Sequence, residues 1–375
     1  MSRKAPLDYQ LNTSFGTKKF SLSNLLIDPI LVFSLLTVLI FGLFVLFSAS
    51  GQATVMVTKQ AIYIAVGLFL MFFISRLDQS VYKSFLMHLF WLGLVLLTWV
   101  LIFPAEGYKT DRWIDLGFIN FQPSEVIRLL LPLAAASYLT RNQRELMIKD
   151  WLVVLIAIFS CSFLIFIQPD LGTALIVLAS GCIPVFLAGF PLLFIMVFIL
   201  LVIISSPFLW ANLTPYMQQR VITLFNPESD LLGAGWNISQ SKTAIGSGGF
   251  WGKGYLNGTQ SQLDFIPESH SDFIFSVIGE EFGFLGICLL LMLYGTILYR
   301  VFKIALNSST EFSRLASTSI GFIFLIYLWI NVSMTVGTLP VVGVPLPLVS
   351  QGGTSILIHL IAFGFVLSMK RRQTW

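Results

Sequence analysis

The sequence predicts an all-α polytopic membrane protein with about ten transmembrane helices and a large outer loop between helices 7 and 8. Hydrophobic residues make up 56% of the chain and charged residues only 11%, whereas soluble domains carry about 25% charged residues. A series of mostly apolar runs approaches the ~20 residues that cross the hydrocarbon core of a bilayer. Lysines and arginines gather in every second connection between these runs. We therefore expect a single membrane-embedded domain, residues 1–375.

The expected helices follow one another along the chain with short connections in the first half. The run 126–140 is short, and the seventh run is separated from the sixth only by Gly189 and Pro191. An even number of spans places both termini on the same side of the membrane. The apolar runs are 30–50, 57–75, 84–103, 126–140, 152–167, 171–188, 190–209, 273–299, 315–338 and 351–369.

The distribution of cationic side chains predicts the orientation in the membrane. Cytoplasmic loops carry an excess of lysine and arginine, and here the excess lies on the side that holds both termini. The tails 1–27 and 370–375 are therefore expected in the cytoplasm, and the segments around 104–125 and 210–271 on the outer side. The cytoplasmic cations include Arg3, Lys4, Lys18, Lys19, Arg76, Lys83, Arg141, Arg144, Lys149, Arg300, Lys303, Arg314, Lys370, Arg371 and Arg372.

Several functions are disfavoured by the composition and by missing motifs. A formal net charge of +4 is too small to indicate nucleic-acid binding. The sequence has no dinucleotide fingerprint, no zinc-ligand spacing and no nucleophile elbow, so we expect no organic cofactor. The first apolar run is expected to insert the chain and to remain in the protein. The three cysteines lie inside apolar runs and are interpreted as small packing residues: Cys161, Cys182 and Cys288.

The outer segment 210–271 is the longest connection and is rich in glycine. Eight glycines lie between Gly233 and Gly258. Such a density allows backbone amides to approach a ligand closely, which is a common way to hold phosphate, although a flexible surface loop has the same composition. The stretch from Gly246 to Lys253 does not have the spacing of a P-loop.

Several ionisable residues lie at or near membrane depth, where a charge is costly and commonly functional. Glu125 and Arg128 share one helical face and either form a structural ion pair or contact a ligand. Asp170, at the turn between the fifth and sixth runs, is equally compatible with a helix cap and a ligand contact. Asp272 lies where the outer loop re-enters the membrane, and its carboxylate caps a helix or takes a proton from a hydroxyl.

These outward-facing charges beside a glycine-rich loop suit a lipid-linked, phosphate-bearing substrate whose tail stays in the bilayer. A series of short motifs follows one another along the chain, at residues 112–117, 122–125, 168–173, 226–230, 233–248, 258–262, 267–275 and 345–353. Through these motifs, in this order, the chain resembles the SEDS family (shape, elongation, division and sporulation proteins) along nearly its whole length.

The resemblance implies a peptidoglycan glycosyltransferase that polymerises lipid II on the outer face of the bacterial inner membrane. It also implies a class B penicillin-binding protein and other elongation-machinery proteins as partners. The uninterrupted segment 226–230, the short tails and the length of the chain are similar to the elongation branch of the family.

Carried over by position, the essential aspartate of the family falls on Asp272, which is then the general base. The resemblance implies that outward-facing cations neutralise the departing pyrophosphate: Arg112, Arg220 and Lys242. It implies further substrate contacts at Glu125, Arg128, Gln262 and Ser350. Magnesium or another divalent cation would share the neutralisation, with Asp272 and Glu125 as candidate ligands.

Three positions depart from the usual family pattern. Arg128 replaces a lysine, which keeps the charge but changes its geometry. Ser271 replaces a threonine and keeps the hydroxyl, whereas Gln351 replaces a tyrosine and loses an aromatic ring. These changes alter the details of substrate contact and leave Asp272 in place.

Two other functions compete with the enzyme. A lipid II flippase would also use many spans with intramembrane carboxylates, but the polar residues gather at the outer boundary and no internal repeat is evident. A non-catalytic scaffold for a penicillin-binding protein would tolerate Asp272→Ala.

Overall fold

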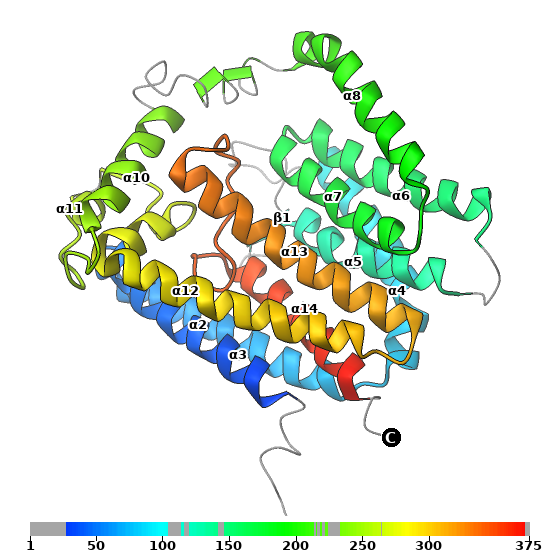
Figure 1. Cartoon of the computed structure of the whole chain (residues 1–375), viewed down its shortest axis with the longest axis horizontal. Helices are drawn as coiled ribbons and strands as arrows, with labels where there is room; N and C mark the ends of the chain where they lie inside the picture. Colours follow the sequence, from blue (N-terminus) through cyan, green and yellow to red (C-terminus); the bar gives the residue numbers. More distant parts are fainter. Residues whose placement is uncertain are drawn as a thin grey trace, which may run out of the picture.

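The computed structural model describes residues 28–103, 114–115, 120–141, 146–213, 215, 218–219, 222–223, 233–263 and 265–371. This part of the chain is nearly all helical (Figure 1). Its only strands are β1 (Ile114–Asp115) and β2 (Asn120–Phe121), which pair antiparallel with Ile114 opposite Phe121. The expected all-α class is therefore confirmed.

Each of the apolar runs in the sequence corresponds to a helix. Among the described residues, seven helices are long and apolar enough to cross a membrane, and α7 is a shorter apolar helix. The exact number of spans stays a prediction. The helices are α2 (Pro29–Ala49), α3 (Thr54–Arg76), α4 (Gln79–Ile102), α5 (Pro123–Leu139), α6 (Ile148–Ile167), α7 (Leu171–Leu187), α8 (Leu192–Asn212), α12 (Ile274–Leu306), α13 (Glu311–Val336) and α14 (Gly353–Arg371).

Large apolar side chains cover the outside of the bundle. Phe33, Phe69 and Phe208 are 61%, 68% and 73% exposed. A soluble protein rarely exposes so continuous an apolar surface, whereas lipid tails are a compatible solvent for it. The chain is a multi-pass membrane protein.

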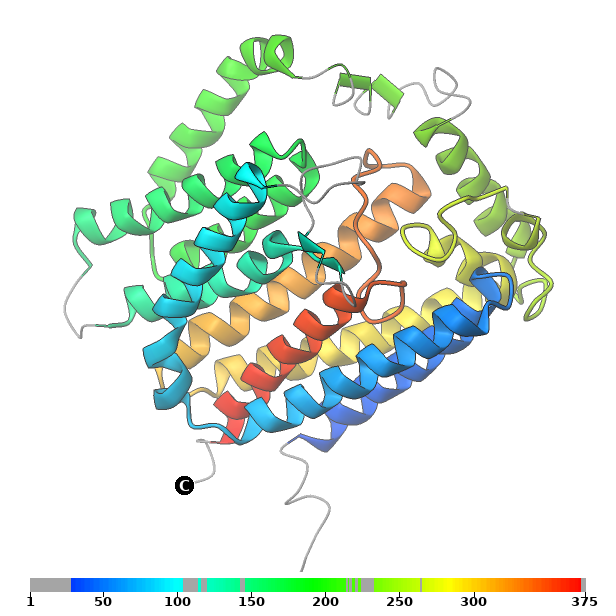
Figure 2. The ribbon, with the colours of Figure 1, turned by 180° about the vertical axis from the view of Figure 1, so that it is seen from behind.

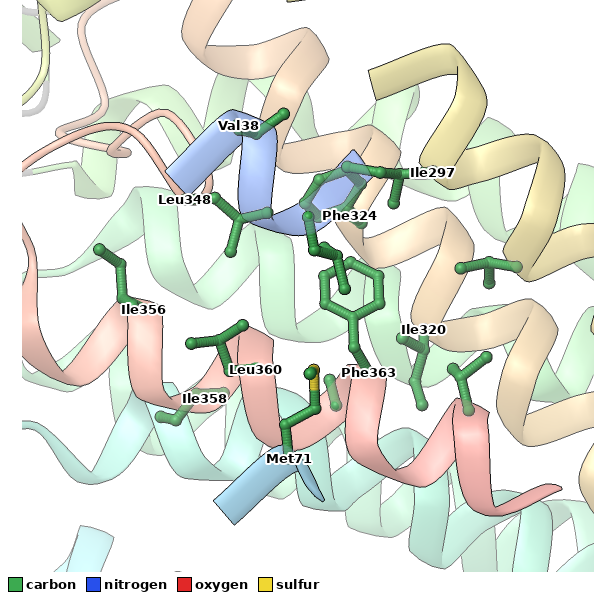
Figure 3. Packing of buried hydrophobic residues seen from close by; sticks show 14 of the residues in the cluster. Val38, Met71, Ile297, Ile320, Phe324, Leu348, Ile356, Ile358, Leu360 and Phe363 are labelled. Carbon is green, nitrogen blue, oxygen red and sulfur yellow. The ribbon is translucent and has the colours of Figure 1, made fainter. Parts of the chain in front are cut away.

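Two large hydrophobic clusters make up most of the described interior. One joins α2, α12, α13 and α14 and contains Phe324 and Phe363, whose rings meet edge to face with centroids 5.2 Å apart (Figure 3). Met71 of α3 and Leu360 of α14 belong to the same cluster. The second cluster joins α4, α5, α6 and α7 around Ile158. Figures 1 and 2 both show α8 leaving the body of the bundle.

The carboxylate of Asp28 links α2, α12 and α14 at the end of the bundle where both described chain ends lie. Asp28 caps α2 by accepting a hydrogen bond from the backbone N–H of Leu31. It also accepts from Nε of Arg300 on α12 at 3.2 Å and from Nζ of Lys370 on α14 at 2.8 Å. Burial of Asp28 would raise its pKa, but the bonds from Arg300 and Lys370 outweigh burial and hold the pKa below the ordinary 3.8.

The long connection between α8 and α12 contains helical structure of its own. Two helices, α10 (Ala234–Gly248) and α11 (Thr259–Gln262), lie in it, and α10 packs against α12 and α13 (Figure 1). The described part of the connection is therefore not a flexible loop.

The glycines of this connection allow two backbones to meet. A Cβ at Gly248 would lie 1.9 Å from the carbonyl oxygen of Gly279 on α12, and one at Gly252, where φ is +80°, would lie 2.1 Å from that of Glu281. The two backbones are close enough to form hydrogen bonds, and the N–H of Lys253 donates to the carbonyl oxygen of Glu280 at 2.9 Å. Close packing on α12, and not an approach to phosphate, explains Gly248 and Gly252.

Candidate functional site

A polar cavity of about 160 Å³ lies between the first turns of α5 and α7, the C-terminal half of α13 and the segment 342–345. Its walls carry two carboxylates and one guanidinium inside an otherwise apolar bundle. Such groups in a membrane protein commonly face a substrate path. The lining residues are Gln122, Glu125, Arg128, Asp170, Thr173, Tyr327, Val342, Gly343, Val344 and Pro345.

Glu125 and Arg128 share this cavity without forming the ion pair that their spacing suggests. The guanidinium of Arg128 instead lies over the ring of Tyr327, 4.0 Å from the ring centre, and the residue is only 3% exposed. Arg128 Nη2 and Glu125 Oε2 are buried atoms with no hydrogen-bond partner among the described residues. Buried polar groups are nearly always hydrogen-bonded, so these two atoms are available to a ligand.

Asp272 is adjacent to this cavity. It lies two residues before the start of α12, and a Cβ placed on Gly343, a lining residue, would lie 3.5 Å from Asp272 Oδ2. Gly343 has φ of +74°, a conformation that glycine adopts without strain. The segment 342–345 can therefore pass directly beside the carboxylate.

Asn331 fixes the backbone on both sides of that contact. Its Nδ2 donates to the carbonyl oxygen of Asp272 at 2.9 Å and to that of Val344 at 2.7 Å. Asn331 is 0% exposed and lies on α13. Sequence reasoning missed it, and the available signal was an amide side chain within the apolar run 315–338.

Ser350 supports the same region from the opposite side. Its hydroxyl donates to the carbonyl oxygen of Ser271 and accepts from the N–H of Leu346 at 2.8 Å. The neighbouring Gln351 N–H donates to His270 O at 3.0 Å. Ser350 is only 2% exposed. Its hydroxyl holds the backbone at Ser271, next to Asp272, and so positions Asp272 through the backbone.

Asp170 combines the two roles that its sequence position left open. Its carboxylate caps α7 by accepting from the N–H of Thr173 at 3.2 Å. The residue also lines the cavity and is 6% exposed. Asp170 is therefore the second carboxylate, with Glu125, that lines this space, and Asp272 lies beside it.

The structure places two predicted contact residues away from the cavity. Lys242 is exposed on α10, with its side chain against Gly337 at the end of α13. Gln262 Nε2 donates to the carbonyl oxygen of Ser48 at 3.1 Å and to its hydroxyl at 3.0 Å, which joins α11 to α2. Arg112 and Arg220 lie outside the described residues.

The described residues contain no group of three or more His, Cys, Asp or Glu side chains arranged to hold a metal. Magnesium, however, often binds through one or two carboxylates plus substrate phosphates. Glu125, whose Oε2 has no partner among the described residues, fits that mode of binding.

The fold and the site together define a multi-pass helical membrane protein with a carboxylate-lined cavity near one end of its bundle. A family model described as cell cycle protein, covering FtsW, RodA and SpoVE, matches residues 28–374. This chain belongs to that family.

Two curated relatives show how far the similarity extends. The chain is 42% identical over 344 residues to peptidoglycan glycosyltransferase MrdB of Escherichia coli K12, covering 92% of this chain and 93% of that protein. It is 31% identical over 357 residues to stage V sporulation protein E of Bacillus subtilis, covering 92% and 97%.

Solved structures show the same fold. The RodA crystal structure from Thermus thermophilus superposes with a TM-score of 0.71 at 28% identity, covering 93% of this chain and 98% of that one. A second structure is described as showing structural coordination of polymerization and crosslinking by a peptidoglycan synthase complex. One of its chains superposes with a TM-score of 0.80 at 31% identity, covering 92% and 98%.

Proposed function

We propose that this protein is a peptidoglycan glycosyltransferase that polymerises lipid II, with Asp272 as the general base. The observation that carries the proposal is the Asp272 carboxylate beside a cavity that also presents a buried guanidinium. The similarity to MrdB over 92% of the chain supports the reaction class.

The proposed reaction is an inverting glycosyl transfer. Asp272 removes the proton from the 4-hydroxyl of the acceptor's N-acetylglucosamine, and that oxygen attacks the anomeric carbon of the donor's N-acetylmuramic acid. The bond from this carbon to undecaprenyl pyrophosphate breaks, and the α linkage becomes β. A sugar hydroxyl is a weak nucleophile, so a positioned base contributes roughly 100- to 10,000-fold.

The cavity supplies the charge that the leaving group needs. Arg128 Nη2, which has no partner among the described residues, donates to the pyrophosphate. Stacking on Tyr327 holds its guanidinium plane in one orientation. A bound magnesium ion, held by Glu125 and by Asp272 or substrate phosphate, would neutralise part of the same charge.

The setting of this reaction follows from the charge distribution and the relatives. Both termini lie in the cytoplasm, and the site faces the outer side of the bacterial inner membrane. A class B penicillin-binding protein cross-links the product during elongation. The similarity to a chain of a peptidoglycan synthase complex supports this partnership.

The test is lipid II polymerisation by the purified protein with a class B penicillin-binding protein that lacks its transpeptidase serine. Wild type, Asp272→Asn and the control Glu311→Gln are compared, with glycan strands separated on a gel. Glu311 is exposed and pairs with Arg314 away from the cavity. We expect strands from wild type and Glu311→Gln only.

Other outcomes separate the competing functions. Strands from Asp272→Asn at the wild-type rate would remove Asp272 from the role of base and leave the enzyme. A folded wild-type complex that makes no strands but moves lipid II between leaflets of a vesicle would instead establish a flippase.

A further inference from the structure

A second cavity lies at the opposite end of the bundle, near both described chain ends and away from Asp272. Its volume is about 680 Å³, and it opens between the first turns of α4 and α13 and the last turns of α5 and α7. The charge distribution assigns this end to the cytoplasm. Its size is within the range of small-ligand sites.

One wall of this cavity presents a buried donor with no partner. Gln79 is only 5% exposed, and its carbonyl oxygen accepts a hydrogen bond from Ser313 Oγ at 2.7 Å. Its amide nitrogen Nε2 has no hydrogen-bond partner among the described residues. A buried donor without an acceptor is costly, so an acceptor in the cavity would be favoured.

A cation lies one turn further along the same helix. The ammonium of Lys83 is 3.5 Å from Thr140 Oγ1 and 5.0 Å from the centre of the Phe312 ring. Within the part of the chain that the structure describes, Lys83 pairs with no carboxylate. The nearby Arg314 is neutralised by Glu311 at 2.7 Å, and both are exposed. The cavity therefore combines one unneutralised positive charge with one unpaired N–H donor.

This polar cavity adjoins an apolar one. A pocket of about 520 Å³ lies between α6, α7 and α13, and Leu187 lines both cavities. The apolar pocket has almost no polar surface, and its walls include Phe159, Ala179, Phe186, Phe190 and Phe322. From Leu315 in the polar cavity to Phe322 in the apolar one, α13 rises about 10 Å.

A ligand that matches both cavities has an anionic head and an apolar tail. We propose that the Gln79–Lys83 cavity binds the phosphate of an anionic phospholipid from the cytoplasmic leaflet, with an acyl chain in the Phe186–Phe322 pocket. Basic pockets between transmembrane helices on the cytoplasmic side are a known way to bind such headgroups. The site is separate from the proposed reaction and does not depend on it.

The test uses the full chain in dodecyl maltoside and phosphatidylglycerol with a photoactivatable group on one acyl chain. After irradiation, mass spectrometry locates the adducts. We expect them on peptides that carry residues 178–190 of α7 and Phe322 of α13. Unlabelled phosphatidylglycerol should compete about tenfold more strongly than phosphatidylcholine. Inorganic phosphate should not compete, because it lacks the tail.

Two variants address the two halves of the site, with one matched control. Lys83→Gln should weaken phosphatidylglycerol binding about tenfold, and Ala179→Phe should reduce it by filling the apolar pocket. Lys303→Gln removes the same charge from an exposed position at the same end of the bundle and should leave binding unchanged. Thermal unfolding in detergent verifies that each variant is folded.

Three results would overturn the proposal. The first is a set of adducts spread over the outer surface with none on α7 or α13. The second is competition by phosphatidylcholine as strong as that by phosphatidylglycerol. The third is competition by inorganic phosphate in the absence of any competing lipid. Because the adducts are mapped on the wild-type chain, the test does not depend on either variant folding.

Discussion

Two carboxylates, Glu280 of α12 and Glu125 of α5, differ in how completely they are paired. Glu280 is 0% exposed, and its Oε1 accepts hydrogen bonds from Lys253 Nζ at 2.7 Å, Thr259 N–H at 2.8 Å and Gln260 N–H at 3.0 Å. Glu125 has an oxygen without any partner among the described residues, and Arg128, one turn away, stacks on Tyr327 instead.

The difference distinguishes a structural charge from one that we propose to be functional. A fully satisfied buried carboxylate organises the chain around it, and here it fastens α11 and the glycine-rich segment to α12. A buried carboxylate and guanidinium left partly unpaired are costly to folding, and the cavity that they line provides a reason for that cost. Loss of the charge should therefore lower mainly the stability of the protein at Glu280 and mainly its activity at Glu125.

The largest expected effect comes from neutralising each carboxylate in turn. Glu280→Gln leaves Lys253, whose side chain is 26% exposed, without its carboxylate partner and weakens the backbone bonds to the Glu280 side chain. It should destabilise the protein by about 3–5 kcal/mol. Glu125→Gln should leave stability within about 1 kcal/mol and abolish polymerisation. Thermal unfolding in detergent and the lipid II gel assay measure the two effects. Equal destabilisation by both variants would contradict the distinction.

A smaller effect is expected from two glycines of α10. Gly248→Ala places a methyl group against the backbone of Gly279 and should cost about 1–3 kcal/mol or more. Gly246→Ala is the matched control, because a Cβ there meets nothing within 4 Å. That substitution should stabilise the helix by about 0.5–1 kcal/mol. The two thermal midpoints should therefore move in opposite directions, and a shared direction would refute close packing as the reason for Gly248.

The positioning of Asp272 can be tested through Asn331. Asn331→Ala removes both bonds to the backbone beside the carboxylate and should lower kcat about tenfold, with little change in KM for lipid II. Ser319→Ala is the control, since the Ser319 hydroxyl bonds only to Leu315 O within the same helix. A rise in KM with an unchanged kcat would assign Asn331 to substrate binding.

The smallest effect concerns Asp28, the paired carboxylate near both described chain ends. Because the pKa of Asp28 lies below 3.8 in the folded protein, its contribution to stability is present above that pH and is lost as the pH falls through the folded pKa. Asp28→Asn should therefore lower the thermal midpoint at pH 7, and the gap to wild type should close below about pH 4. A difference in thermal midpoint that does not change with pH would show that the charge of Asp28 does not contribute to stability.

Much of the fold could be predicted from the sequence because the signals are local. A run of apolar residues long enough to cross a bilayer must satisfy its backbone within the segment, so it forms a helix. Each predicted run corresponds to an observed helix. Asp272 could be placed where the long connection meets a helix for a similar reason, since that position depends on the adjacent apolar run.

The partners of each charge were decided only by tertiary structure. The spacing of Glu125 and Arg128 suggested an ion pair, but Tyr327, on a distant helix, takes the guanidinium. Gln262, which is predicted to contact substrate, bonds to Ser48 of α2, far away in the sequence. Asn331 reaches Asp272 only because α12 and α13 pack together. Hydropathy and spacing report which face of a helix is apolar, whereas pairing depends on which helices meet, and that is settled by packing of the whole bundle.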